Sequence, residues 1–438
     1  MKKRKPHRRQ IKPQTIGPEQ LYQVDGLTHE AKGVARLDGK VTFIEGALPD
    51  ERVKARVTKA GSRFNQAILT EVIQPSAERI KPACPHYAKC GGCSFQHVNS
   101  GYQLKTKKIW LQGQLRKVFA GQEIGEMSDR AFAYRRRARI AVQVNEHKVT
   151  IGFRGKASKQ IMPIDNCIVL TEPLQQLYAA LRQKLSKDEI APHVGHIELL
   201  EDSQGVAVLI RLTANIAQSH KQNWQAWAAQ GQISLYWQEQ QESKAKVAGD
   251  QLRHYQLEDL RLVYHPQDFI QVNARMNELM VAKAMEWLAP SQDDVVLDLF
   301  CGVGNFSLPL AKRARQVIGV EVQESMVDAG RRNASLNKLH NLSFIAADLT
   351  QPVASEFANL GVTQVLLDPP RAGAKEFLDT LVALKPRQIL YISCDAATLT
   401  RDAEYLVEKG FSVLRVTIMD MFPQTSHVES MMLLERAS

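Results

Sequence analysis

Residues 294–307, with the sequence DVVLDLFCGVGNFS, place a short apolar strand directly before a glycine-containing turn. Gly302 and Gly304 allow the backbone to turn sharply and to approach a ligand closely. The stretch lacks the third glycine of a dinucleotide site and the Lys-Ser or Lys-Thr ending of a phosphate-binding loop. It therefore indicates a cofactor loop of another kind, although an NAD-type site stays open.

The segments on either side of this stretch alternate between strands and helices. A helix is expected over 274–289 and another from Ser325, and further strands are expected at 316–320, 342–346, 364–367 and 388–393. Such alternation predicts a doubly wound α/β domain, whose ligands bind at the carboxyl ends of the strands.

Acidic residues follow the second and third of these strands. Glu321 can accept hydrogen bonds from both ribose hydroxyls of an adenosine group, and Asp348 is placed to meet the adenine edge. A shortened glycine turn with acids at these two positions is typical of domains that bind S-adenosylmethionine. An NAD-type site with Glu321 on the ribose is the alternative.

Three more polar residues are expected at the same edge of the sheet. Asp368 lies in LLDPPRAG (366–373), Cys394 in YISCDAATLTRD (391–402) and Glu429 in MFPQTSHVESMMLL (421–434). A lone cysteine at a strand end is commonly buried and inert. Three polar groups that converge on one edge weaken that interpretation.

These residue types suit methylation of carbon 5 of a uracil. That carbon is a weak nucleophile until a thiolate adds to carbon 6 and makes the ring enolate-like. A base must then remove the proton from carbon 5 before the thiolate leaves. Cys394 fits the role of nucleophile and Glu429 that of base.

The blocks FCGVGNF, LLDPPRAG, YISC…ATLTRD and MFPQTSHVES together resemble the signatures of the RNA uracil-5-methyltransferase family. The resemblance covers nearly all of the chain. It implies a Rossmann-like class I methyltransferase domain over 266–438, with S-adenosylmethionine as cofactor. It also implies that Cys394 is the nucleophile, that Glu429 is the base, and that the residues around the cofactor or target base are Gln271, Phe300, Asn305, Glu321, Asp348 and Asp368.

One departure from the family pattern concerns the pair of residues after Cys394. The family usually has Asn-Pro there, whereas this chain has Asp395-Ala396. Losing the proline loosens the turn, and a carboxylate that points inward would disfavour the thiolate. The departure therefore puts in question how readily Cys394 forms its thiolate, more than its role as nucleophile.

The chain before residue 266 is expected to form two further domains. Short strands separated by turn residues over 13–75 predict a small OB-like β-barrel, which resembles a TRAM domain. Residues 76–265 are expected to form a small mixed α+β domain, with a basic helix over 102–119 that could dock on the catalytic domain. Residues 1–12 are expected to be a disordered basic arm.

Four cysteines in the expected middle domain suggest a metal site. Cys84, Cys90 and Cys93 have the spacing C-x5-C-x2-C, and Cys167 supplies a distant fourth thiolate. Four thiolates satisfy a tetrahedral zinc ion or a [4Fe–4S] cluster, and unligated core cysteines are the third possibility. The spacing leaves these open, whereas the family resemblance implies the [4Fe–4S] cluster.

The charge of the chain indicates a polyanionic partner. There are 57 Lys and Arg residues against 46 Asp and Glu, a net charge of +11. The runs YRRRAR (134–139) and FRGK (153–156) would supply phosphate-binding charge, with a solvated strand edge as the alternative. No apolar run is long enough to span a membrane. We expect a cytoplasmic monomer without an obligate protein partner.

The combination of a TRAM domain and a cluster resembles the branch of the family that acts on large-subunit (23S) ribosomal RNA. The target uracil must leave its stack to reach Cys394, so a flipped-out or single-stranded uridine is expected. A uridine of another RNA is the alternative within the family. A non-catalytic RNA chaperone or an exocyclic amine methyltransferase would not need both Cys394 and Glu429.

Overall fold

A computed structural model of the chain describes residues 17–145, 148–239, 247–248, 252–351, 357 and 360–437. The expected basic arm over 1–12 lies outside these residues. The chain divides into two compact units, Met1–Ala83 with Ser94–Thr106 and Cys84–Cys93 with Lys107–Ser438. The boundary between them falls within helix α1 (Ser100–Leu115). The expected limits of the middle and catalytic domains stay predictions.

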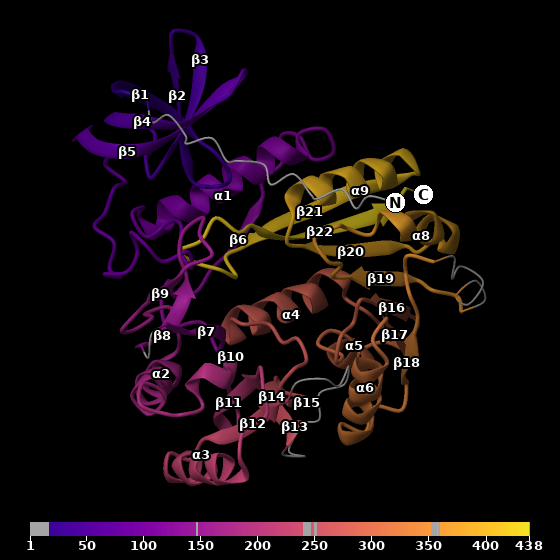
Figure 1. Ribbon diagram of the computed structural model, residues 1–438. Coiled ribbons are helices and arrows are strands. Elements are labelled where there is room, and N and C mark those ends of the chain that lie inside the picture. The colour runs from indigo at the N-terminus through magenta and orange to yellow at the C-terminus, as the bar shows by residue number, and fades with distance from the viewer. Residues whose placement is uncertain are drawn as a thin grey trace, which may run out of the picture. The chain divides into compact units, whose positions relative to one another are not determined.

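The first unit contains a small β-barrel, drawn in indigo in Figure 1. Its five described strands close in the order β1-β2-β3-β5-β4, and β3 runs parallel to β5. Alternate side chains fill the interior, as a barrel of this size requires. The predicted N-terminal barrel is confirmed. Its strands are β1 (Glu19–Leu27), β2 (Lys32–Leu37), β3 (Lys40–Glu45), β4 (Arg52–Ala60) and β5 (Phe64–Gln74).

The second unit contains a mixed sheet, whose described strands have the order β13-β12-β11-β10-β7-β8-β9. One face of this sheet packs on α2 (Glu172–Leu185) and α3 (Gln218–Gln230), because Leu174, Tyr178 and Trp224 share a core with its inward side chains. A separate hairpin, β14 (Arg253–Leu257) and β15 (Leu260–Tyr264), follows it. The sheet strands are β7 (Arg137–Asn145), β8 (Lys148–Arg154), β9 (Ile161–Pro163), β10 (Val194–Asp202), β11 (Gly205–Leu212), β12 (Ser234–Gln238) and β13 (Val247–Ala248), and η1 (Ala191–His193) precedes β10.

The expected hairpin turn or loop over Trp237–Ala248 falls mostly on residues outside the described ones. At its ends, Trp237 pairs with Ala248 and Gln238 with Val247, both antiparallel.

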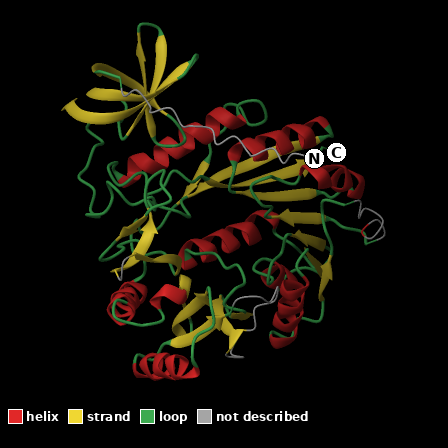
Figure 2. Cartoon of the chain, viewed as in Figure 1, coloured by secondary structure: helices red, strands yellow, loops and turns green. Residues whose placement is uncertain are grey.

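The second unit also contains the doubly wound sheet that the sequence predicts. Its described strands have the order β18-β17-β16-β19-β20-β22-β21-β6, and β22 is antiparallel to both of its neighbours. Helices α4, α5 and α6 cover one face, and α8 and α9 cover the other (Figures 1 and 2). The strands are β16 (Val295–Leu299), β17 (Gln316–Glu321), β18 (Leu342–Ala346), β19 (Gln364–Leu367), β20 (Gln388–Ser393), β21 (Phe411–Met419), β22 (Glu429–Arg436) and the short β6 (Gly125–Met127). The helices are α4 (Ala274–Leu288), α5 (Ser307–Ala311), α6 (Glu324–Leu336), α8 (Leu378–Leu384) and α9 (Ala396–Glu408), with η2 (Lys375–Phe377) before α8.

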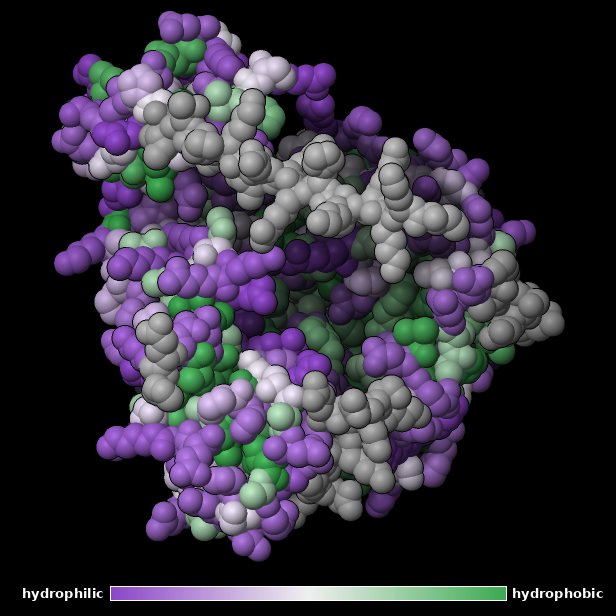
Figure 3. Space-filling model, in the orientation of Figure 1, coloured by the Kyte–Doolittle hydropathy of each residue, from purple (hydrophilic) through white to green (hydrophobic). Residues whose placement is uncertain are grey.

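The central strands of this sheet are buried on both faces. Every residue of β16, β19 and β20 is buried, as near-continuous apolar runs predict for parallel strands covered by helices. Figure 3 shows a mainly hydrophilic face that is hollowed over α4, where apolar residues are visible. Among the described helices, none combines the length and apolar character that a membrane crossing needs.

Candidate active site

The glycine turn after β16 lies at the point where the strand order reverses. Strands β17 and β19 flank β16 and lead toward opposite edges of the sheet, which is where doubly wound folds bind ligands. Phe300, Gly302 and Gly304 have φ angles of 60°, 56° and 98°. A Cβ on Gly304 would lie 2.4 Å from Leu308 Cδ1, and the positive φ would strain any other residue at this position. Phe300 adopts its φ without being a glycine, a strained conformation of the kind that clusters at functional sites.

Glu321 lies at the end of β17 with its carboxylate fixed against the turn. Its Oε2 accepts a hydrogen bond from Gly302 N at 3.3 Å, and its Oε1 accepts from Val322 N and Gln323 N at 2.9 and 3.1 Å. These bonds link the ends of β16 and β17. The acid therefore lies at the switch point of the sheet, as the sequence predicts.

Asp348 lies on an exposed turn after β18. Its Oδ1 accepts from Thr350 N at 3.0 Å and from the Thr350 hydroxyl at 2.7 Å. These two hydrogen bonds hold the pKa of Asp348 below its ordinary value. The carboxylate is thus engaged within its own turn, and its expected contact with an adenine edge stays a prediction.

Asn305 belongs to a partly buried polar group that connects the glycine turn to α4 and β14. Asn305 and Asn277 exchange two side-chain hydrogen bonds of 2.8 and 2.9 Å. The Tyr255 hydroxyl donates to Asn305 Oδ1 at 3.0 Å. Local sequence patterns do not indicate Asn277 or Tyr255 at this site, because their partner Asn305 is distant along the chain.

The register of β20 and β22 brings Cys394 and Glu429 together. Ser393 pairs with Ser430 in this antiparallel ladder, so Cys394, just after β20, and Glu429, the first residue of β22, occupy the next position. Burial raises the pKa of Cys394 to about 11, and the carboxyl groups of Glu429 and Asp368 add to the rise, whereas Arg371 opposes it. The thiol therefore faces a group of carboxyls and one guanidinium.

The two carboxyl groups are themselves hard to ionise. Burial raises the pKa of Glu429 to about 8, with a smaller contribution from Asp368. Burial also raises the pKa of Asp368, at the end of β19, to about 7. Perturbed carboxyl groups of this kind are a common property of catalytic sites.

The loop over 420–428, which leads into β22 and Glu429, is held in place by side chains from distant segments. The buried Lys107 of α1 donates to Asp420 Oδ1 at 2.7 Å, and the Tyr134 hydroxyl donates to Pro423 O at 3.0 Å. Asn273 Nδ2 donates to Met421 O at 3.3 Å. These contacts fix the approach of the loop to β22 and hence the place of the carboxylate.

Asp298 is a candidate residue that the sequence reasoning missed. It lies within β16, is fully buried, and accepts a short hydrogen bond from the Ser307 hydroxyl. Its Oδ1 has no hydrogen-bond partner among the described residues. Burial raises its pKa to about 7, and Asp368 and Glu321 add to the rise. An acid inside an otherwise apolar strand was the signal that could have identified it.

Asp395 does not point toward the thiol. Its Oδ1 accepts hydrogen bonds of 3.0 Å from Ala397 N and Thr398 N, which makes it the N-cap of α9. The concern that this carboxylate disfavours the Cys394 thiolate is therefore not supported by the geometry. Cys394 instead lies just before a helix N-terminus, where the helix dipole favours negative charge.

The cysteine-rich loop packs against the turn after β8. Cys90 forms an isolated bridge with Gly155, and Gly91 N donates to Arg154 O at 2.9 Å. A Cβ on Gly91 would lie 2.9 Å from that oxygen, so glycine permits the close approach. All six cysteines of the chain lie among the described residues, and none forms a disulfide.

The thiols of this loop and Cys167 influence one another. Burial raises the pKa of Cys167 to about 12, and Cys93 and Cys90 contribute to the rise. Cys84 contributes to the raised pKa of Cys90. Cys84 thus affects the ionisation of Cys90, and Cys90 and Cys93 affect that of Cys167, whereas the role of the four cysteines as metal ligands stays a prediction. Among the described residues, however, no three or more Cys, His, Asp or Glu side chains have an arrangement that could hold one metal ion.

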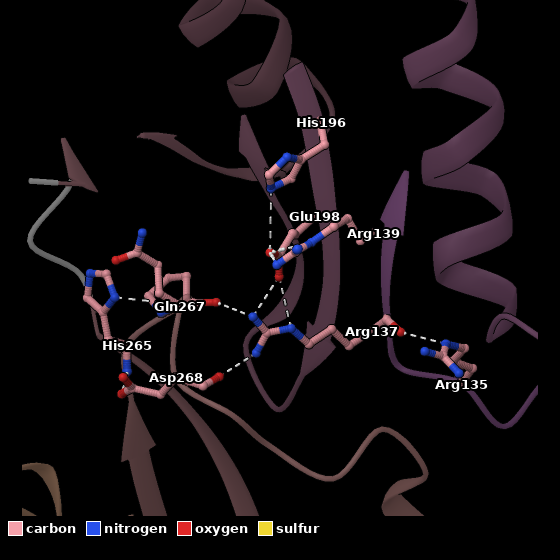
Figure 4. Close-up of polar contacts among 9 residues, drawn as sticks. Arg135, Arg137, Arg139, His196, Glu198, His265, Gln267 and Asp268 are labelled. Carbon is pink, nitrogen blue, oxygen red and sulfur yellow. Dashed lines mark hydrogen bonds and ion pairs between the residues drawn. The ribbon is translucent and has the colours of Figure 1, made fainter. Parts of the chain in front are cut away.

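Most arginines of the run over 134–139 are buried or form hydrogen bonds within the protein. The Arg136 guanidinium is buried, and Arg137 is held by Glu198 and by main-chain carbonyls (Figure 4). Arg139 also binds Glu198, but two thirds of its side chain is exposed. The interpretation of the whole run as phosphate-binding charge is therefore wrong for Arg136 and Arg137.

A comparison with protein families accounts for nearly the whole chain. The model described as tRNA (Uracil-5-)-methyltransferase matches residues 99–437, and the TRAM domain model matches residues 13–70. The chain belongs to the tRNA (uracil-5-)-methyltransferase family. The family that the motifs resemble is thus confirmed, and so is the TRAM identity of the barrel.

Curated members of the family share this chain's full length. The chain is 60% identical over 425 residues to the 23S rRNA (uracil(1939)-C(5))-methyltransferase RlmD of Marinomonas sp. (strain MWYL1), with 97% of each protein covered. It is 56% identical over 436 residues to the protein of the same name from Marinomonas posidonica, with 100% of each covered. The protein of that name from Pseudomonas putida is 41% identical over 430 residues, covering 96% of this chain and 94% of that protein.

A solved structure of another RNA methyltransferase has the same fold as this chain. The Pyrococcus abyssi tRNA (uracil-54, C5)-methyltransferase, crystallised with S-adenosyl-L-homocysteine, superposes with a TM-score of 0.73. It is 23% identical and the match covers 95% of this chain and 100% of that one. The predicted class I methyltransferase fold is thereby confirmed.

Proposed function

We propose that this chain uses S-adenosylmethionine to methylate carbon 5 of a uridine in 23S ribosomal RNA. The substrate is proposed from the relatives, whose names specify uracil 1939 of 23S rRNA. The observation that supports the chemistry is the proximity of a thiol and a half-buried carboxyl, Cys394 and Glu429, which directly adjoin the paired residues Ser393 and Ser430. An amine methyltransferase needs no such pair.

The residues at the switch point fit the proposed cofactor. Glu321 offers a fixed carboxylate for ribose hydroxyls. Gln271, Phe300 and Asn305 are further cofactor contacts in the same proposal. Asp298 leaves one buried carboxyl oxygen without a partner. When bound, S-adenosylmethionine supplies an electrophilic methyl group on a positively charged sulfur. The carboxyl groups near the turn repel one another, so a bound positive charge would favour their ionised forms.

In this proposal Cys394 forms and later breaks one covalent bond. Its thiolate adds to carbon 6 of the uracil. Carbon 5 then attacks the sulfonium methyl group, and the sulfur–methyl bond breaks with S-adenosylhomocysteine as the leaving group. Glu429 then removes the proton from carbon 5, and the thiolate leaves carbon 6 as the double bond re-forms. The raised pKa values of both groups describe the protein without substrate. Beside a positive charge, the thiol and the carboxyls would each ionise more readily.

The proposed substrate is tested by mapping 5-methyluridine in 23S rRNA. RNA from a strain that lacks the gene should lose one 5-methyluridine, at position 1939. Restoring the gene should recover it, and restoring the Cys394→Ala variant should not. Loss of a methyl group from tRNA instead, or from an exocyclic amine, would contradict the proposal.

We also propose that Cys84, Cys90, Cys93 and Cys167 hold a [4Fe–4S] cluster. Four soft thiolates gathered from a loop and a second segment fit the ligand set of such a cluster. The cluster would tie the cysteine loop to the segment around Cys167.

Metal analysis of the full chain, purified without oxygen, tests this second proposal. We expect about four irons per chain, with a brown colour, and loss of iron in the Cys167→Ser variant. The Cys301→Ser variant is the matched control. Cys301 is a buried thiol of the glycine turn and not a proposed ligand, so this variant should keep its iron. Stoichiometric zinc without iron would contradict the proposal.

A further inference from the structure

The segment over 266–273, which carries Gln271, has little structure of its own. It lies between β15 and α4 and belongs to no regular helix or strand. A turn closes its start, because Asp268 N donates to His265 O and His265 N donates to Asp268 Oδ2, at 2.8 and 2.7 Å. The position of Gln271 must therefore be set by contacts with other parts of the chain.

Arg137 holds the beginning of this segment. Its guanidinium donates from Nη2 to Pro266 O at 3.0 Å and from Nη1 to Asp268 O. The same group donates from Nε and Nη2 to Glu198 Oε2 at 3.1 and 2.6 Å. Figure 4 shows Arg137 between Glu198 on one side and the 265–268 turn on the other. The planar guanidinium can satisfy these acceptors together because its donors point in fixed directions.

Arg136 holds the end of the same segment. Its Nε donates to Gln271 O at 2.8 Å, and its main-chain N donates to Val272 O at 2.8 Å. The guanidinium lies over the Tyr255 ring at 4.8 Å, and Tyr255 is the residue whose hydroxyl donates to Asn305. Arg136 thus contacts Gln271 directly and Asn305 through one intermediate.

We propose that Arg136 and Arg137 are positioning residues that hold Gln271 for cofactor binding. This inference rests on the proposed function, in which Gln271 contacts S-adenosylmethionine. Burying two adjacent cations is costly, and Arg136 has no carboxylate partner among the described residues. The free-energy cost of burying these guanidinium groups is offset because their N–H groups donate hydrogen bonds to several main-chain carbonyls.

The exposed fraction of each arginine side chain distinguishes a positioning role from a role in RNA binding. Only 15% of the Arg137 side chain is exposed, whereas 66% of the Arg139 side chain is. Both residues bind Glu198, from neighbouring outward positions of β7. Only Arg137 also contacts the 265–268 turn. Arg139 is therefore a matched control for the charge and for the ion pair.

The test compares three variants of the full chain: Arg137→Met, Arg137→Lys and Arg139→Met. Equilibrium binding of S-adenosylmethionine without RNA, the KM values for cofactor and RNA, and the thermal midpoint would be measured. We expect Arg137→Met to weaken cofactor binding about tenfold and to raise the cofactor KM similarly, with the RNA KM unchanged. Arg137→Lys should recover part of the loss. Arg139→Met should bind the cofactor within about twofold of the wild type.

Equal cofactor affinity in Arg137→Met and the wild type would overturn the inference and leave the proposed function intact. Equal losses in Arg137→Met and Arg139→Met would also overturn it, because the ion pair alone would then account for the effect. A wild type that binds no S-adenosylmethionine would contradict the proposed function itself.

Discussion

Cys394 and Glu429 directly follow and precede the paired residues Ser393 and Ser430 of β20 and β22, and the Glu429 carboxyl adds to the rise that burial causes in the pKa of the thiol. The relationship has a chemical consequence in the protein without substrate. A thiol whose pKa is about 11 is almost entirely protonated at neutral pH, so it is protected from oxidation and alkylation. Reactivity is then expected only when substrate and cofactor are in place.

Removing the Glu429 charge should make the free thiol more reactive. In Glu429→Gln, the loss of a neighbouring negative charge lowers the pKa of Cys394, so its alkylation by iodoacetamide at pH 9 should be several-fold faster. The difference should shrink below pH 8, where Glu429 is itself protonated. Mass spectrometry of the peptide containing Cys394 gives the rate. An unchanged rate at pH 9 would show that the two groups do not interact.

The same variant should stop the reaction late. Gln keeps the size of Glu429 but cannot readily accept a proton. Glu429→Gln should therefore bind cofactor and RNA, transfer the methyl group, and accumulate a methylated covalent complex that releases slowly. Labelled methyl groups retained on denatured protein would be counted alongside those in free RNA. Normal free product with no retained label would exclude Glu429 as the base.

The buried carboxyl of Asp298 should make stability depend on pH. Its pKa is about 7 in the folded protein and near 3.8 when unfolded, so the protonated form favours folding. That contribution is complete below pH 4 and is lost as the pH rises through 7. Asp298→Asn, which stays neutral, should gain a few kcal/mol relative to the wild type between pH 5 and pH 8. Denaturant unfolding at both pH values measures the gain. A constant difference would contradict the raised pKa.

Substitutions of the N-cap residue Asp395 distinguish its effect on stability from an effect of its charge. Asp395→Ala should cost about 1 kcal/mol of stability because two N–H groups of α9 lose their acceptor. Asp395→Asn, which restores the residue usual in the family, should stay within a few tenths of a kcal/mol of the wild type. Chemical denaturation compares the two. Equal destabilisation by both would mean that the carboxylate charge has another partner.

Much of the catalytic domain could be predicted from the sequence because central strands such as β19 and β20 are buried on both faces and are therefore near-continuous apolar runs. Strands β18, β19 and β20 were predicted with the bounds that the structure shows. The sequence pattern does not predict strands β21 and β22, although it predicts Glu429 at this edge of the sheet. Its pairing with β20 depends on a reversal of chain direction that local apolar patterns do not encode.

The arginine run shows where sequence reasoning failed. Arg136, Arg137 and Arg139 look alike in a basic segment, and a basic segment favours RNA. Their different roles depend on Glu198 and on the 266–273 segment, which lie about sixty and a hundred and thirty residues further along the chain. The direction of the Asp395 side chain could have been predicted, because an Asp directly before a helical pattern is a common N-cap.

The most direct test of the account is covalent trapping on RNA that carries 5-fluorouridine at the target position. Fluorine on carbon 5 cannot be removed as a proton, so the reaction should stop after methyl transfer with the RNA still bound to the protein. The full chain with S-adenosylmethionine should give an adduct that survives SDS, and mass spectrometry should place the RNA on Cys394. The Cys394→Ala variant should give none. An adduct that persists in that variant, or a wild type that methylates ordinary RNA yet forms no adduct, would contradict the assignment of Cys394 as the nucleophile.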